Sequence, residues 1–166
     1  MPHPLSTLGI AHTAISLIPL VAGLWSLARH RRIEPRATSG RIYLGGLAVS
    51  VLTSFWLSST GGFNPGHALG ILALLAITGA LLAPTLAVLG RAKDYLATLG
   101  LSFSFFLLLV PGINETLTRL PPSGPIADGP QSAIVKGTLA AWFLLFLAGY
   151  TLQVLAIRAQ RRAETA

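Results

Sequence analysis

The sequence predicts an all-α membrane protein, a polytopic helical bundle formed by a single domain over residues 1–166. Hydrophobic residues make up 52% of the chain and charged residues only 10%. The mean hydropathy is +0.68, and the few charges are gathered between long apolar runs. A chain with so little charge and such long apolar runs is typical of a protein that places its apolar surface in lipid.

Five apolar runs predict five transmembrane helices. Crossing a hydrocarbon core of about 30 Å takes roughly 20 helical residues. The runs that approach this length are residues 8–28, 42–59, 67–89, 95–113 and 134–157. The run 42–59 is the shortest, and serines and threonines dilute it from Ser50 onward, so four spans remain an alternative. Tyr43 and Trp56 flank that run at positions that suit the two headgroup regions, which favours its insertion.

The first run, residues 8–28, is expected to remain in the mature protein. No basic residue precedes it, and it is longer than the core of a signal peptide. It ends in LARHRR, where a cleaved signal would carry small residues. We therefore expect a spanning helix at this position.

The basic residues predict the orientation, because Lys and Arg in short loops stay on the cytoplasmic side. With the N-terminus outside and the C-terminus inside, only Arg119 and Lys136 lie outside. The residues left inside are Arg29, Arg31, Arg32, Arg36, Arg41, Arg91, Lys93, Arg158, Arg161 and Arg162. This pattern fits a bacterial inner membrane. It also accounts for the formal charge of +7, so no nucleic-acid partner is expected.

Glycines and prolines are expected to shape the bundle and its loops. Residues 114–137 are rich in both, which predicts a long outer loop that caps or binds something. Proline in a helix removes a hydrogen bond, so kinks are expected at Pro19, Pro84 and Pro111. The small residues expected to let neighbouring backbones approach closely are Gly45, Gly46, Gly70 and Gly79.

Two adjoining stretches, GRIYLGGLAVSVLTSFWL (residues 40–57) and GGFNPGHALGILALLAI (residues 61–77), carry a family resemblance. They resemble the bacterial predicted-membrane-protein family described as domain of unknown function 2306, over roughly residues 8–100. The matching positions are Gly40, Arg41, Tyr43, Phe63, Pro65 and His67. Two cytoplasmic histidines that are frequent in the family are replaced here by RATSGR and GRAKDY. The resemblance implies a membrane topology and brings no established activity.

The composition excludes some kinds of chemistry, and the sequence offers no motif for others. The chain has no cysteine, which excludes disulfides, iron–sulfur clusters and thiol catalysis. No protease, kinase, P-loop or zincin pattern is present, so the sequence contains no catalytic motif. No carboxylate falls in the middle of an apolar run, which counts against a proton-coupled transporter.

The candidate site consists of ionisable residues predicted near the periplasmic face. His12 and His67 lie on helices that run in the same direction, at matching depth in the outer leaflet. Two such imidazoles can hold haem b axially, with Arg119 and Lys136 free to pair with its propionates. Alternatively they can bind a divalent metal, with Glu115 as a third ligand. The competing interpretation is structural: His67 in a first helical turn, His12 bonded to a neighbouring backbone or hydroxyl group, and Glu115 paired with Arg119 at i,i+4.

Three functions therefore remain open for this chain. The most specific is a haem- or metal-binding bundle, with electron transfer as its use. The second is an accessory or scaffold subunit of a larger membrane complex, held by small-residue helix faces or by self-association. The third is a transporter for a small lipophilic or quinone-like solute. All three have the lipid bilayer as a partner.

Overall fold

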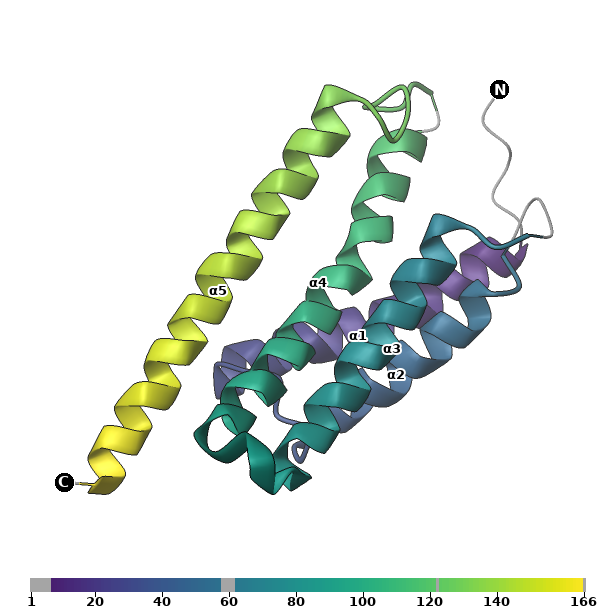
Figure 1. The fold of residues 1–166 in the computed structure, drawn as a ribbon. Coiled ribbons are helices and arrows are strands. Elements are labelled where there is room, and N and C mark those ends of the chain that lie inside the picture. The colour runs from purple at the N-terminus through teal and green to yellow at the C-terminus, as the bar shows by residue number, and fades with distance from the viewer. Residues whose placement is uncertain (1–6, 58–61, 122, 166) are drawn as a thin grey trace.

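The computed structural model describes residues 7–57, 62–121 and 123–165, and within them the chain forms helices and no strand (Figure 1). The α-helices are α1 (Thr7–His30), α2 (Thr38–Ser54), α3 (Pro65–Leu82), α4 (Lys93–Arg119) and α5 (Ala133–Thr165). Two short 3-10 helices, η1 (Ala83–Thr85) and η2 (Ala87–Ala92), connect α3 to α4. The predicted all-α fold with five helices is confirmed.

Four segments of the described chain are long and apolar enough to cross a bilayer, judged by length and composition. They are Thr7–His30, Pro65–Thr85, Ala87–Arg119 and Ala133–Glu164. α2 has 17 residues, about 25 Å at 1.5 Å per residue, and is shorter than a hydrocarbon core of about 30 Å. These four segments indicate a multi-span membrane protein by length and composition, and a fifth span through α2 stays a prediction.

Local chemistry moves several helix ends away from the predicted boundaries. α2 ends at Ser54, before the predicted end at residue 59, which lies outside the described residues. α3 ends at Leu82, before the predicted residue 89, because Pro84 lacks the N–H that a continuing helix requires. Gly90 then turns the chain with φ +48°, a conformation that glycine adopts without steric cost. At the other end of the bundle, α4 continues past the predicted residue 113 to Arg119.

Packing runs mainly between helices that are neighbours in sequence. α1 packs on α2, α3 packs on α4, and α5 packs on α4. Tyr43 of α2 is fully buried in the core, and its ring lies 6.1 Å from that of Phe105 on α4. Ser104 gives its hydroxyl proton to the carbonyl of Leu101, so the Tyr43 hydroxyl donates to Ser104 Oγ, 2.6 Å away.

Two of the four predicted close-approach glycines lie against a neighbouring helix. A Cβ on Gly46 would lie 2.9 Å from the Pro19 ring, and one on Gly70 would lie 2.9 Å from Val51 Cγ1. Gly45 and Gly79 have nothing within 4 Å of that position, so the expectation fails for both. One close helix contact that sequence reasoning missed is at Gly100, where a Cβ would lie 2.6 Å from the Ala76 carbonyl oxygen.

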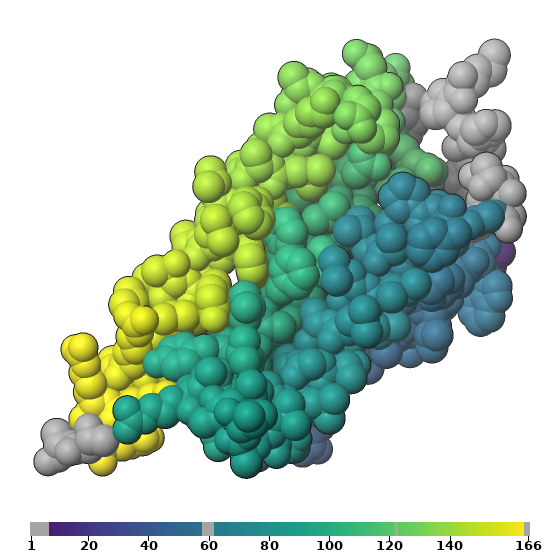
Figure 2. Space-filling model, viewed as in Figure 1, coloured from purple at the N-terminus to yellow at the C-terminus, as the bar shows by residue number. Residues whose placement is uncertain are grey.

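The outer faces of the helices present large apolar side chains. Trp25 of α1 and Leu144, Leu145 and Leu152 of α5 are all more than 60% exposed. In the space-filling view, α5 lies along one edge of the molecule with its outer side uncovered (Figure 2). Such faces suit contact with lipid.

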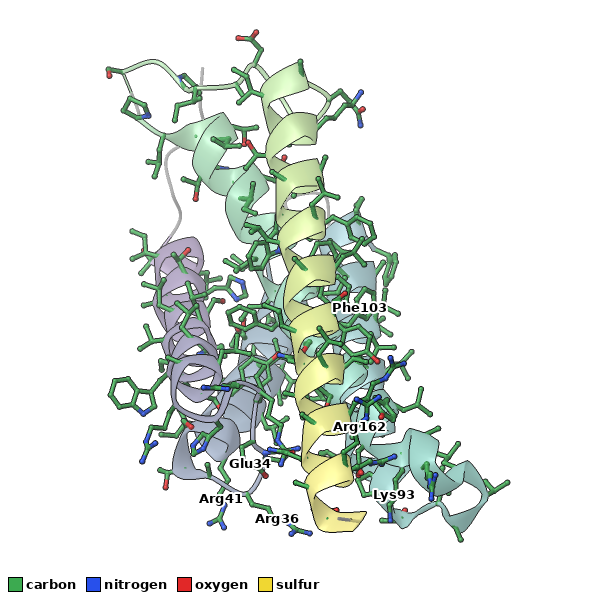
Figure 3. All side chains as sticks on the ribbon, turned by 90° about the vertical axis from the view of Figure 1, so that its left-hand side faces the viewer. Glu34, Arg36, Arg41, Lys93, Phe103 and Arg162 are labelled. Carbon is green, nitrogen blue, oxygen red and sulfur yellow. The ribbon has the colours of Figure 1, made fainter. Side chains whose placement is uncertain are left out.

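The basic residues gather at one end of the bundle. Figure 3 shows Arg36, Arg41, Lys93 and Arg162 there, where the α1–α2 turn, the α3–α4 connection and the end of α5 meet. Arg119 ends α4 and Lys136 lies in the first turn of α5, at the other end. Figure 1 shows this end of the α4–α5 hairpin projecting beyond the other three helices. The separation matches the predicted grouping of charges, while the orientation in a membrane stays a prediction.

Candidate functional site

A cavity of about 470 Å³ lies between the first three helices and the C-terminal half of α4. Its lining is largely apolar, with Leu17 and Leu20 of α1 facing Leu107 to Leu109 of α4. Pro111 and Gly112 of α4 also line it, and Gly112 has nothing within 4 Å of its Cβ position. The polar side chains in the wall are His12, Thr13, Ser16, Ser50, Ser54, Glu115, Thr116 and Thr138. An apolar pocket with a few grouped polar atoms is the usual form of a small-molecule site.

The hydrogen bonds around His12 define its tautomer. Thr53 has one hydroxyl proton, which it gives to the carbonyl of Ser50 at 2.9 Å. The contact of 2.9 Å between His12 Nδ1 and Thr53 Oγ1 therefore has the imidazole as donor. His12 consequently carries its proton on Nδ1 when neutral, and the lone pair lies on Nε2.

The nearest group to that lone pair is already engaged. Ser16 Oγ lies 3.4 Å from His12 Nε2, but it gives its proton to the backbone carbonyl of His12 at 2.8 Å. Ser50 Oγ lies 2.6 Å from Ser16 Oγ and acts as the donor in that pair. His12 Nε2 therefore has an acceptor lone pair with no strong donor among the described residues, in the side chain that lines the cavity.

His67 has the opposite tautomer and no spare lone pair. Its Nδ1 accepts from the backbone N–H of Asn64 at 3.3 Å, so the proton lies on Nε2, which donates to the carbonyl of Ser54 at 3.1 Å. Asn64 in turn caps α3 by accepting the backbone N–H of His67 at 3.1 Å, and Pro65 occupies the first helical position. The imidazole is 4% exposed and stacks on Phe55 at 4.8 Å. His67 therefore closes the start of α3 onto the end of α2.

The structure brings some of the predicted site residues together and leaves others apart. His12 and Glu115 line the same cavity, whereas His67, Arg119 and Lys136 are not in its wall. Glu115 and Arg119 form the i,i+4 ion pair that the sequence offered as an alternative. For His67 to coordinate haem iron or a metal, its two hydrogen bonds would have to be rearranged.

No group of three or more His, Asp or Glu side chains able to hold a metal ion occurs within residues 7–57, 62–121 and 123–165. His12 is the one predicted ligand whose free nitrogen belongs to the cavity wall. Haem b and a divalent metal both stay predictions for this chain.

Sequence reasoning missed the hydroxyl groups that fix the tautomer of His12 and surround its imidazole. Ser16, Ser50 and Thr53 lie on two helices, and Thr53 is 41 residues from His12 along the chain. Ser16 and Ser50 do carry a signal, since they interrupt apolar runs on the helix faces that meet. The interpretation of His12 as bonded to a neighbouring hydroxyl group is confirmed by its contact with Thr53.

No family model matches this chain, and no match was found among curated proteins or among solved structures. The resemblance to the family described as domain of unknown function 2306 therefore stays a prediction.

Proposed function

We propose that the protein is a membrane-embedded binding protein for a lipophilic molecule that carries a hydroxyl group, such as a quinol. The observation that carries this proposal is the unengaged Nε2 lone pair of His12 in the wall of a largely apolar cavity. An imidazole lone pair accepts a hydrogen bond from an O–H group. The apolar lining suits the remainder of such a molecule.

The other hydroxyl groups of the cavity favour a ligand that donates a hydrogen bond. Thr13, Ser54 and Thr138 give their protons to carbonyls of their own helices. Ser16 does the same, and Ser50 gives its proton to Ser16. Apart from Thr116, these side chains offer the ligand lone pairs and no proton. A molecule that brings its own O–H is therefore favoured over one that carries only a carbonyl group.

Haem b is the second candidate ligand for this cavity, and His12 Nε2 is again the nitrogen that would bind it. A histidine that coordinates a metal usually donates its other N–H to a fixed partner, which sets the tautomer and the ring orientation. His12 has this arrangement through Thr53. In this version of the proposal His12 Nε2 would bind the haem iron, and the haem would supply one-electron transfer.

The proposed setting is a bacterial inner membrane, with the N-terminus outside, the C-terminus inside and five spans. The support is the gathering of basic side chains at the end opposite the cavity. The cavity then lies in the outer leaflet, where a ligand can enter from lipid. An accessory role in a larger complex is compatible with the exposed apolar faces, but no structural observation selects a protein partner.

The test begins with the purified full-length protein in mild detergent. Its oxidised and reduced visible spectra report haem, and mass spectrometry of an organic extract reports other lipophilic ligands.

Binding of reduced decylubiquinone is then compared between the wild type, His12→Ala and His30→Ala. We expect His12→Ala to weaken binding about tenfold, since one hydrogen bond contributes up to about 1.5 kcal/mol. The His30→Ala control is expected to bind as the wild type does. Equal binding by the wild type and His12→Ala, with no haem spectrum, would overturn the proposal.

A further inference from the structure

A second cavity, of about 340 Å³, lies at the basic end of the bundle and is unrelated to the His12 site. The turn after α1 forms one wall, with His30, Arg31, Arg32 and Glu34. α5 forms the opposite wall through residues from Gln153 to Gln160, and Thr98 of α4 lies between them. Figure 3 shows this region where the α1–α2 turn faces the end of α5.

The interior of this cavity presents hydrogen-bond donors. Thr98 is 5% exposed, and its hydroxyl has no hydrogen-bond partner within the part of the chain that the structure describes. Gln153 is 9% exposed and accepts the Ser102 hydroxyl on Oε1 at 2.7 Å. This bond fixes the amide so that its NH₂ group remains as a donor. The Thr98 hydroxyl and the Gln153 NH₂ group open onto the cavity, where a ligand oxygen can accept hydrogen bonds from them.

The mouth of the cavity carries positive charge. Arg32 is held by Glu34, whose Oε2 accepts from Arg32 Nε at 3.0 Å and Nη2 at 2.7 Å. Arg31 makes no ion pair among the described residues, and its backbone lies in the left-handed region with φ +59°. The single carboxylate in the wall is therefore paired, while Arg31 and His30 remain beside the opening.

We propose that this cavity binds a phosphate group, with Arg31 at the mouth and Thr98 and Gln153 donating to its oxygens from within. A phosphate offers several strong acceptor oxygens and negative charge, which complement a cavity of donors rimmed by arginine. Basic pockets between membrane helices on the cytoplasmic side are suited to anionic lipid headgroups. The same chemistry also fits a free phosphate compound, so the experiment separates the two sources.

The experiment uses the full-length protein in detergent and native mass spectrometry to measure bound ligand. Dioleoyl phosphatidylglycerol is titrated against the wild type, Arg31→Gln, Thr98→Val and Arg41→Gln. Thr98→Val keeps the shape of the side chain and removes its hydroxyl. Arg41→Gln is the matched control, because it removes the same charge from the same end of the bundle outside the cavity wall. Inorganic phosphate is added as a competitor in a second arm.

We expect Arg31→Gln to weaken lipid binding about tenfold and Thr98→Val about fivefold, with Arg41→Gln within twofold of the wild type. Displacement of the lipid only at phosphate concentrations far above that of the lipid identifies a lipid headgroup as the ligand. Tight binding of phosphate alone, lost in the same two variants, identifies a free phosphate compound. If Arg41→Gln weakens binding as much as Arg31→Gln, or Thr98→Val has no effect on either ligand, the cavity is not a phosphate site.

Discussion

Thr53 and Ser54 are adjacent in α2, and each accepts a hydrogen bond from a different histidine. Thr53 Oγ1 accepts from His12 of α1, and the Ser54 carbonyl accepts from His67 of α3. The last turn of α2 is thereby fixed between its two neighbours. The two histidines that sequence reasoning paired as cofactor ligands are instead linked through this turn, and only His12 retains a lone pair for a ligand.

The His67 arrangement predicts a structural role that can be measured. We expect His67→Ala to lower the free energy of unfolding by about 2 kcal/mol, because the bond from the Asn64 N–H to His67 Nδ1 and the bond to the Ser54 carbonyl are both lost. Thermal unfolding in detergent measures this. His30→Ala, an exposed histidine at the other end, is expected to leave stability unchanged. A His67→Ala protein as stable as the wild type would contradict the capping role.

The Thr53 hydroxyl is expected to act on the ligand through His12. Thr53→Val removes the acceptor that holds the Nδ1 proton, so the lone pair is no longer fixed on Nε2 and binding of reduced decylubiquinone should weaken about threefold. Thr53→Ser keeps the hydroxyl and should restore binding. Equal binding by the Val and Ser variants would show that the tautomer has no influence.

The cavity can be filled without disturbing the fold. A Cβ on Gly112 meets nothing within 4 Å, so Gly112→Leu should place its side chain in the cavity space and reduce quinol binding at least tenfold. Gly79→Leu is the matched control, because Gly79 is also open but lies outside the cavity wall. Both proteins should unfold at similar temperatures. Undiminished binding by Gly112→Leu would place the ligand elsewhere.

Contact between α3 and α4 depends on Gly100. A methyl group there would lie 2.6 Å from the Ala76 carbonyl oxygen and 2.9 Å from Ala80 Cβ. Since backbone atoms cannot move aside cheaply, Gly100→Ala should destabilise the protein by about 1–3 kcal/mol despite the better helix propensity of alanine. Gly79→Ala, on an open face of α3, should be neutral or slightly stabilising. Similar unfolding temperatures for the two variants would argue against close packing at Gly100.

The orientation can be tested with reporter fusions. We expect a fusion after Ala166 to report the cytoplasm and a fusion within residues 121–130 to report the periplasm, because basic loops remain inside. A fusion in the turn at residues 31–37 should also report the cytoplasm. A periplasmic signal from that turn would show that the first helix has the opposite orientation and that the His12 cavity lies in the other leaflet.

Composition and local spacing were enough to predict the helices and some of the contacts. Apolar length predicted all five helices, and the i,i+4 spacing of Glu115 and Arg119 predicted their ion pair. The sequence NPGH also contains the capping signal at the start of α3, with Asn64 before Pro65. These features depend on residues that are close together in the chain.

The environment of His12 could not be predicted in the same way. Its partner Thr53 lies on another helix, so the contact depends on how α1 and α2 are aligned along their axes. The basic-end cavity likewise depends on how far α5 stands from the α1–α2 turn, because Gln153 and Arg31 are remote in sequence. Neither the alignment of α1 with α2 nor the distance of α5 from the α1–α2 turn is determined by periodicity or by composition.

Helices that are neighbours in sequence pack on one another, and this has a consequence for the order in which the bundle assembles. Because α1 packs on α2 and α3 on α4, each hairpin has its partner surface as soon as its second helix leaves the ribosome. Contacts that are local along the chain also close with little loss of chain entropy. α5 is synthesised last and packs on a helix that is already in place, so the bundle can grow in the order of translation without waiting for a distant segment.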